Sequence, residues 1–401
     1  MSTSIGAADS HILSACGIIT AEEEEERNLS MTTKSSKEKG TNRIMKRDTA
    51  PDGGPSLQFP FTIIDESCQS VEPAVLVPLI STDSCRALVL LGDPCQLPPT
   101  VKTDPSGAGL LSTPLMSRLA TILPSPVIVT AKADRTDCDN SILDCKATRR
   151  AKSNVLRNKI GTSAYRKKFS GSLLLSVQYR MHPSIAAFSS SIYYDGLLKT
   201  PSLLSHYRSF PQSLNDQYAL NGKPLTNVRF INVGGNDNEK RDEGSNRYNA
   251  QIEERRSFVN ELEAIEVIKV IKALLSESST KRSIGVISPY SSQVLHIKKL
   301  LSEQNVSEDE RSFVEVNTVD GYQGRERDII ILSTVRSNRQ NKVGFLADWR
   351  RMNVAITRSK CALIVVGDIN TLSKGNLHWN AFSNWCQDTG CVVDADKNNA
   401  C

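Results

Sequence analysis

The sequence contains no long apolar segment and no basic segment ahead of an apolar one near its N-terminus. Its apolar runs fall well short of the ~20 residues that a membrane-spanning helix requires. The short apolar patch at residues 12–19 has no positively charged region before it. These absences exclude membrane proteins and secreted precursors from the expected classes, so we expect a soluble protein without a membrane partner.

Cysteine and histidine are scattered along the chain rather than grouped. The ten cysteines and five histidines form no C-x-x-C pair and no paired cluster, which argues against a zinc module and against a disulfide framework. The nearest approach to a metal-ligand set is His378 with Cys386, Cys391 and Cys401, whose spacing is irregular. We therefore expect reduced thiols and a location in the nucleus or the cytoplasm.

The composition is that of a globular protein. With 39% hydrophobic and 23% charged residues, 22 glycines and 17 prolines, the chain is neither collagen-like, nor a coiled coil, nor wholly disordered. Its 401 residues exceed one ordinary domain, so two or three domains are expected. The net charge of +5 is too small to indicate nucleic-acid binding by itself.

Three segments lack the pattern of a packed core. Residues 1–57 hold an acidic run and then Ser/Thr/Lys-rich sequence, which predicts a disordered leader. An insertion at 131–170 is basic: from Cys145 to Ser170 there are nine Lys or Arg and no Asp or Glu, as in a solvated loop or an element that faces nucleic acid. The segment from Ser205 to Arg256 is polar and rich in Asn and Gly, and is predicted to be a loop insertion.

Elsewhere, short β-branched apolar runs alternate with helical patterns. These runs are apolar on both faces, as in parallel strands covered by helices, so the predicted fold class is α/β. The runs are Phe61–Ile64, Ala87–Leu91, Ser283–Ile287, Ile329–Leu332 and Ala362–Val366.

One helix is predicted in detail. Its apolar residues recur at helical spacing and are expected to cover the sheet; they are Leu262, Ile265, Ile268, Ile271 and Leu275. Asn260 and Glu263 resemble a capping box at its start, with Asn in place of the usual Ser or Thr.

Two predicted strands end in polar residues suited to phosphate chemistry. Asp65 and Glu66 follow the first strand, and nucleotide hydrolysis needs one carboxylate for the Mg²⁺ shell and another for the attacking water. Taken alone, such a pair is also typical of a solvated strand end. The second strand is followed by Gly92, which allows a tight turn, and by Gln96, whose amide could contact a γ-phosphate.

Four further blocks follow in order along the chain. They begin at Gln178 (QYRMHP), Gly285 (GVISPY), Val316 (VNTVDGYQGRERD) and Arg350 (RRMNVAITRSK). With the two strand ends, these blocks resemble the superfamily 1 helicases of the nonsense-mediated-decay and senataxin type, over residues 59–368. The resemblance implies two RecA-like lobes with parallel sheets and an ATP-dependent helicase that moves 5′ to 3′ on single-stranded RNA or DNA, with ATP and Mg²⁺ as cofactors.

The resemblance also implies the roles of single residues in catalysis. Asp65 would hold Mg²⁺ through water, Glu66 would activate the attacking water, and Gln96 would sense the γ-phosphate. Arg358 matches an arginine finger, a task that suits a permanently charged fork able to bind phosphate oxygens.

The other implied roles concern binding. The nucleotide would be bound by Tyr179 stacked on the base, Arg180 on a phosphate, and Gly324 and Glu326, with Glu326 at the ribose. Nucleic acid would be bound, mostly along its backbone, by Ser288, Tyr290, Thr318 and Arg336. His182, followed by Pro183, is interpreted as a residue that shapes the turn after the QYRM sequence.

The chain departs from the family pattern in one major respect. The phosphate-binding loop G-x-x-x-x-G-K-[ST], expected ahead of the Asp65–Glu66 strand, is absent; Gly222-Lys223 is followed by Pro224 and lies elsewhere. Without this loop the nucleotide lacks a lysine on its phosphates and a helix N-terminus. Ser67, where the family usually has Ala, is interpreted as negligible.

The predicted organisation is a leader (1–57), an incomplete first lobe (58–176), a second lobe (177–372) and a tail (373–401). Two hypotheses remain open. The chain is a fragment of an ATP-driven helicase, whose first lobe a protein partner or an N-terminal part completes, or it is a helicase-derived nucleic-acid-binding or scaffold protein that has lost hydrolysis. The retention of the carboxylate pair, Gln96, Arg180 and Arg358 together favours the first hypothesis.

Overall fold

The computed structural model describes residues 59–80, 85–101, 111–122, 127–129, 173–218, 226–235, 237–242, 257–277, 282–304 and 306–395. The predicted leader (1–57) and the basic insertion (131–170) lie outside these ranges. The chain divides into two compact units, Met1–Leu123 and Pro124–Cys401. The predicted boundary between the lobes, at residue 176, therefore falls inside the second unit.

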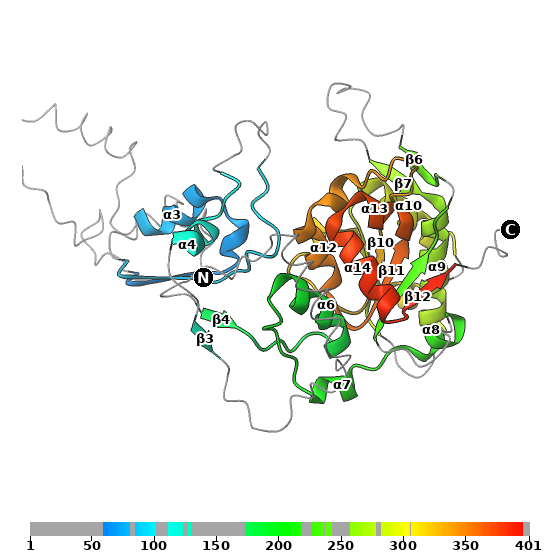
Figure 1. Ribbon diagram of the computed structural model, residues 1–401, viewed down its shortest axis with the longest axis horizontal. Coiled ribbons are helices and arrows are strands. Elements are labelled where there is room, and N and C mark those ends of the chain that lie inside the picture. Colours follow the sequence, from blue (N-terminus) through cyan, green and yellow to red (C-terminus); the bar gives the residue numbers. More distant parts are fainter. Residues whose placement is uncertain are drawn as a thin grey trace, which may run out of the picture. The chain divides into compact units, whose positions relative to one another are not determined.

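The second unit is built on a six-stranded parallel sheet (Figure 1). The strand order is β12 (Val392–Asp394), β5 (Val228–Asn232), β11 (Ser359–Gly367), β10 (Arg327–Ser333), β8 (Ile284–Ser288) and β9 (Val314–Thr318). All neighbouring strands are parallel. The continuous apolar runs predicted for β8, β10 and β11 are confirmed, because these central strands are buried on both faces.

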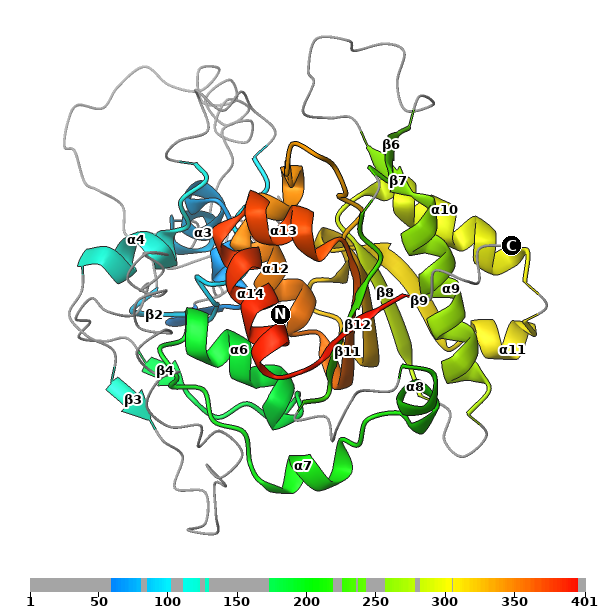
Figure 2. The same cartoon turned by 45° about the vertical axis from the view of Figure 1, so that its right-hand side comes forward.

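Helices cover both faces of this sheet, as Figure 2 shows. One face is covered by α9 (Glu261–Leu275) and α10 (Ser291–Ser302), which pack on Ile329, Ile331 and Ile364. The other face is covered by helices that include α6 (Pro183–Tyr193), α12 (Trp349–Ile356), α13 (Ile369–Gly375) and α14 (Leu377–Asp388). The α/β class is thus confirmed.

One predicted loop is wrong. The segment Ser205–Arg256, predicted to be a loop insertion, contains β5, which pairs with both β11 and β12. The same segment also contributes α8 (Gln212–Gln217) and β6 (Glu239–Arg241), and α7 (Leu203–Tyr207) overlaps its start. The predicted tail (373–401) contains α14 and β12, so it continues the second unit's sheet. Smaller elements are β7 (Phe258–Asn260), paired antiparallel with β6, and α11 (Glu308–Arg311).

The start of α9 agrees only partly with the predicted capping box. The Asn260 side chain accepts the backbone N–H of Glu263 at 3.1 Å, as predicted. The Glu263 carboxylate does not return to the Asn260 backbone N–H, which donates to Gln293 Oε1 instead. The apolar face is also rotated from the prediction, because Leu262 and Ile265 are each 38% exposed.

The first unit has a two-stranded parallel sheet, β1 (Phe61–Ile64) and β2 (Ala87–Leu90), both as predicted from the apolar runs. Helices α3 (Glu72–Ile80) and α4 (Leu115–Ile122) accompany it, with a small core around Ile64, Val75 and Leu115. Phe61 and Ile63 on the sheet are 73% and 66% exposed. A second small parallel pair, β3 (Val127–Val129) and β4 (Leu173–Leu175), belongs to the second unit. None of the helices in the described ranges has the length and apolar character needed to cross a membrane.

Candidate functional site

The predicted carboxylate pair lies in a sharp turn directly after β1. Glu66 has φ +50°, a left-handed conformation, and its backbone N–H donates to Asp65 Oδ1 at 2.9 Å. The Glu66 carboxylate accepts the side-chain amide of Gln69 at 2.5 Å. Asp65 and Glu66 are both exposed, so the turn presents two carboxylates to solvent at the carboxyl end of a strand.

The turn after β2 packs closely against this first turn. The carbonyl oxygen of Leu91 accepts both the backbone N–H (2.8 Å) and the hydroxyl (2.9 Å) of Ser67, which is fully buried. A Cβ at Gly92 would lie only 3.0 Å from the Ser67 hydroxyl. The interpretation of Ser67 as a negligible change is therefore wrong, because its hydroxyl joins the two turns that carry the predicted catalytic residues.

Gln96 lies on the second of these turns. Its amide nitrogen donates to Asp93 Oδ2 at 2.8 Å, and its backbone N–H donates to the Asp93 carbonyl at 3.0 Å. Since β1 and β2 are paired and parallel, Asp65, Glu66 and Gln96 all follow the same edge of one sheet. The structure thus brings these three residues, predicted from two separate motifs, to one side of the first unit.

The donor chemistry at this edge suits Mg²⁺ in part. Carboxylate oxygens are preferred Mg²⁺ ligands, and Mg²⁺ typically keeps several waters and takes phosphate oxygens as further ligands. Within the described part of the chain there is no group of three His, Cys, Asp or Glu side chains that could hold a metal alone. Asp65 would therefore hold the ion through one of its waters, and water and a phosphate would complete the shell. This result also leaves His378, Cys386 and Cys391 without a metal-binding arrangement.

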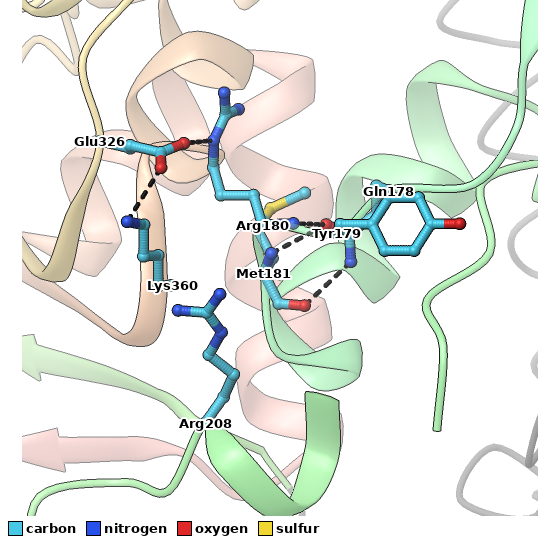
Figure 3. Close-up of a pocket in the computed structure, with 7 residues that line it drawn as sticks. All are labelled: Gln178, Tyr179, Arg180, Met181, Arg208, Glu326 and Lys360. Carbon is cyan, nitrogen blue, oxygen red and sulfur yellow. Dashed lines mark hydrogen bonds and ion pairs between the residues drawn. The ribbon is translucent and has the colours of Figure 1, made fainter. Parts of the chain in front are cut away.

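A pocket of about 440 Å³ lies in the second unit (Figure 3). It is lined by Gln178, Tyr179, Arg180, Met181, Arg208, Glu326 and Lys360. Glu326 immediately precedes β10 and Lys360 is the second residue of β11, so the pocket lies at the amino ends of these two strands.

The turn that carries Tyr179 and Arg180 is held by the side chain of Gln178. Its Oε1 accepts the backbone N–H groups of Arg180 (3.0 Å) and Met181 (2.8 Å), and its Nε2 donates to the Met181 carbonyl at 2.9 Å (Figure 3). The amide also donates to the Thr200 hydroxyl. These bonds fix the direction in which Arg180 leaves the backbone.

Arg180 and Lys360 both bind the carboxylate of Glu326. Arg180 Nε donates to Glu326 Oε2 at 2.6 Å, and Lys360 Nζ lies 2.9 Å from Oε1 (Figure 3). The hydrogen bonds from Arg180 and then Lys360 lower the pKa of Glu326 to about 2. The carboxylate therefore stays ionised, and two cations are held at defined positions in the pocket.

The remaining residues predicted to bind nucleotide lie around this cluster. The ring of Tyr179 is 60% exposed at the pocket, which leaves a face open for stacking. Gly324 has φ +76°, a conformation that favours glycine, and lies two residues before Glu326 without lining the pocket. Arg358 is only 2% exposed; its Nε donates to the Val354 carbonyl at 3.0 Å, and its role as an arginine finger stays a prediction.

The residues predicted to contact nucleic acid lie at the opposite end of the sheet. Ser288 and Thr318 end β8 and β9, and Arg336 follows β10. Ser288, Tyr290 and Arg336 are 0%, 2% and 6% exposed, and Thr318 is half-buried. The sheet therefore separates the two predicted sites, and three of these side chains offer little surface to a strand.

His182 has the structural role that was predicted for it. It caps the N-terminus of α6: its Nδ1 accepts the backbone N–H of Ser184 at 3.2 Å. Burial lowers the pKa of His182 to about 4, so the ring stays neutral and able to accept this bond at neutral pH.

Two cations of the pocket were missed in the sequence. Lys360 belongs to the block that starts at Arg350. Residues two positions apart in an extended segment point to the same face, so the spacing of Arg358 and Lys360 could have indicated this cation. Arg208 had no such signal, because it lies in the polar segment predicted to be a loop insertion.

The fold and these clusters define a class: an α/β protein with parallel sheets, which has carboxylates after adjacent parallel strands in its first unit and a pocket rich in fixed cations in its second. Comparison with known proteins narrows this class. A family model described as an AAA domain matches residues 162–370, and another with the same description matches residues 20–104.

Known proteins with similar sequences agree with these family matches. The chain is 30% identical over 345 residues to the regulator of nonsense transcripts 1 homolog of Drosophila melanogaster (86% of this chain, 24% of that protein). It is 32% identical over 351 residues to the human probable helicase senataxin (86% and 11%), and 31% identical over 332 residues to the mouse 5′-3′ DNA helicase ZGRF1 (82% and 14%). The chain belongs to the superfamily 1 helicases of the nonsense-mediated-decay and senataxin type. It spans less than half the length of the curated relatives that it matches.

Proposed function

We propose that this chain is the part of an ATP-dependent superfamily 1 helicase that carries the second nucleotide-binding lobe and the catalytic carboxylates of the first. The observation that carries this proposal is the cluster of Arg180, Glu326 and Lys360 beside the exposed ring of Tyr179. An aromatic face together with fixed cations suits a nucleotide, which has a base to stack and phosphates to bind. Family membership supports ATP as that nucleotide.

The residues of the first unit would act on the phosphate end. Bound ATP would supply the phosphoryl group that is transferred to water, and bound Mg²⁺ would neutralise charge on the phosphate oxygens. Asp65 would hold the Mg²⁺ shell through water, Glu66 would accept the proton of the attacking water, and Gln96 would contact the γ-phosphate. Arg358 would stabilise the charge that develops during transfer.

The second ligand would be single-stranded RNA or DNA, with translocation from 5′ to 3′. The name of the mouse relative supports this polarity and a DNA substrate, whereas the name of the Drosophila relative points to transcripts. Because Ser288, Tyr290 and Arg336 are buried, contact with a strand through these residues requires a rearrangement at the carboxyl end of the sheet. The same family membership supports a nuclear or cytoplasmic location.

A second function is favoured by one observation: the 401 residues contain no G-x-x-x-x-G-K-[ST] loop. We keep as the alternative a helicase-derived protein that binds nucleic acid, or acts as a scaffold, without hydrolysis. Under the first function, a protein partner or a longer form of the chain supplies the loop and completes the first lobe.

Coupling between the two ligands tests the proposal. The affinity of the full chain for fluorescent single-stranded RNA and DNA oligonucleotides should change when ATP and Mg²⁺ are added, and Arg180→Gln should abolish that change. An affinity that ATP leaves unaltered in the folded protein would support the scaffold alternative. ATP binding without any binding of either oligonucleotide would contradict both functions.

A further inference from the structure

Arg208 is the one cation of the pocket whose charge the protein leaves without a carboxylate partner among the described residues. Seven residues line the pocket, and Glu326 is their only acid. Both of its oxygens are already bound, Oε2 by Arg180 and Oε1 by Lys360. Three cations therefore face one carboxylate, which leaves the pocket with an excess of positive charge.

The side chain of Arg208 is held so that it points into this space. Its backbone N–H donates to the Leu204 carbonyl at the end of α7, and its carbonyl accepts the side-chain amide of Asn227 at 2.8 Å. Figure 3 shows the guanidinium directed toward the part of the pocket beside Lys360, with no ion pair to the other residues drawn.

The hydrogen bonding of Arg208 is incomplete. Its Nε is buried and has no hydrogen-bond partner among the residues that the structure describes. The neighbouring thiol of Cys361 does not compensate the charge, because burial raises the pKa of that thiol and keeps it neutral. A buried donor on a cation is costly when it is left unbonded, and an anion bound to the outer nitrogens of the same guanidinium offsets part of that cost through its charge.

We propose that Arg208 binds a phosphate group of the nucleotide in this pocket, as a third cation beside Arg180 and Lys360. The proposal rests on the proposed function, since it takes the pocket's ligand to be a nucleotide. A guanidinium presents several donors in one plane, and this arrangement matches two oxygens of a phosphate. The neutral hydroxyls of a ribose do not require such a charged, planar group. Arg208 would thereby make the pocket selective for nucleotides over nucleosides.

The test compares ligands that differ only in phosphate. Binding of ADP, adenosine and inorganic phosphate to the full chain is measured by calorimetry or by competition with a fluorescent ADP analogue. Arg208→Gln should weaken ADP by about tenfold or more, the effect of losing a hydrogen bond to a charged group. The same variant should leave adenosine unchanged, and Arg208→Lys should lie between the two because it keeps the charge and loses the fork.

A matched control removes one positive charge elsewhere. Arg339 is 91% exposed and pairs with Asp237 on the surface, so Arg339→Gln should bind ADP like the wild type. Circular dichroism and thermal unfolding check that each variant is folded. If Arg208→Gln does not fold, the ligand affinities of the folded Arg208→Lys variant are compared with those of the wild type instead.

The outcomes separate this inference from the proposed function. Normal ADP binding by Arg208→Gln, with weaker binding by Arg180→Gln, would overturn the role of Arg208 and leave the proposed function intact. An equal loss for adenosine, or inorganic phosphate competing as well as ADP, would overturn the assignment to a nucleotide phosphate. Absence of ADP and ATP binding to the folded wild type would overturn both.

Discussion

Two nitrogens of the Arg336 guanidinium are bonded to the carboxylate of Glu239, Nε at 2.9 Å and Nη2 at 3.0 Å. The third nitrogen, Nη1, donates to the hydroxyl of Tyr290 at 3.1 Å, and the guanidinium lies 4.3 Å from the centre of the Phe258 ring. Glu239 comes from β6 and Phe258 from β7. Arg336, predicted from the sequence to contact nucleic acid, is therefore the residue that holds this two-stranded hairpin to the end of β10.

Removing either partner of this pair should destabilise the second unit. The two side chains are only 7% and 11% exposed, and breaking a buried pair costs about 3–5 kcal/mol because the other charge is left uncompensated. We expect losses of this order for Arg336→Ala and for Glu239→Gln, measured by urea unfolding. Arg339→Ala, which breaks the exposed pair with Asp237, is the control and should cost less than about 1 kcal/mol. A similar small loss for Arg336→Ala would show that this cluster is not structural.

Glu263 should make stability depend on pH. Burial raises the pKa of its carboxyl from 4.5 to about 8, although Val335 N–H and the Ser333 hydroxyl each donate to it at 2.7 Å. The folded state therefore keeps this proton between pH 4.5 and about 8, where the unfolded chain has released it. Because the folded state binds more protons in this window, stability must fall as the pH rises through it.

The comparison with Glu263→Gln isolates this effect. The free energy of unfolding of the wild type, relative to that of the variant, should decrease from pH 5 to pH 8 in urea titrations. Glu303→Gln, a change of an exposed carboxylate on the surface, controls for the general loss of a negative charge. A constant difference between wild type and Glu263→Gln across this range would mean that the bonds from Val335 and Ser333 keep the carboxylate ionised.

Tyr179 should contribute to nucleotide binding through its ring and not through its hydroxyl. Base stacking on an aromatic ring is worth about 1–3 kcal/mol, so Tyr179→Ala should weaken ADP binding roughly tenfold or more, and Tyr179→Phe should retain it. Because the side chain is 60% exposed, neither change should lower the unfolding temperature appreciably. Equal ADP affinities for Tyr179→Ala and Tyr179→Phe in the same titration would exclude stacking.

The sequence predicted those parts of the fold that depend on local pattern. β1 and β2 were recognisable because continuous apolar runs are typical of parallel strands; Asp65 follows β1 directly, and Gln96 lies on the turn after β2. β5 was missed because Arg229 interrupts its apolar run. This arginine is 1% exposed, and its guanidinium donates to the carbonyl oxygens of Thr226 and Val228, a compensation that no local pattern reveals.

The residues of the candidate sites could be predicted only where they belong to a recognisable sequence motif. Arg336 and Glu239 are 97 positions apart, so neither residue by itself indicates that the pair is buried. Arg208 reaches the pocket because α7 ends there, which is a consequence of tertiary structure. In contrast, Arg180 and Glu326, which are 146 positions apart, were both assigned to the nucleotide through their motifs and do meet in one pocket.

The basic segment between Cys145 and Ser170 should add to nucleic-acid affinity. Its nine Lys or Arg are not balanced by any acid, and each contact with a phosphate steepens the salt dependence of binding. Deleting residues 145–170 should weaken binding to a single-stranded oligonucleotide and flatten the slope of log affinity against log salt. The same affinity and slope in the deletion variant would assign the segment to a solvated loop.

Hydrolysis by the 401-residue chain alone should be poor. Glu66 and Asp65 are exposed and in place after β1, yet the loop that would bind the β- and γ-phosphates is absent from the sequence. We expect ATP turnover with saturating polynucleotide to stay near background and Glu66→Gln to leave it there. Adding a polypeptide that carries the G-x-x-x-x-G-K-[ST] loop should restore turnover that depends on Glu66. Turnover typical of helicases by the chain alone, removed by Glu66→Gln, would instead show that other residues bind the phosphates in place of that loop.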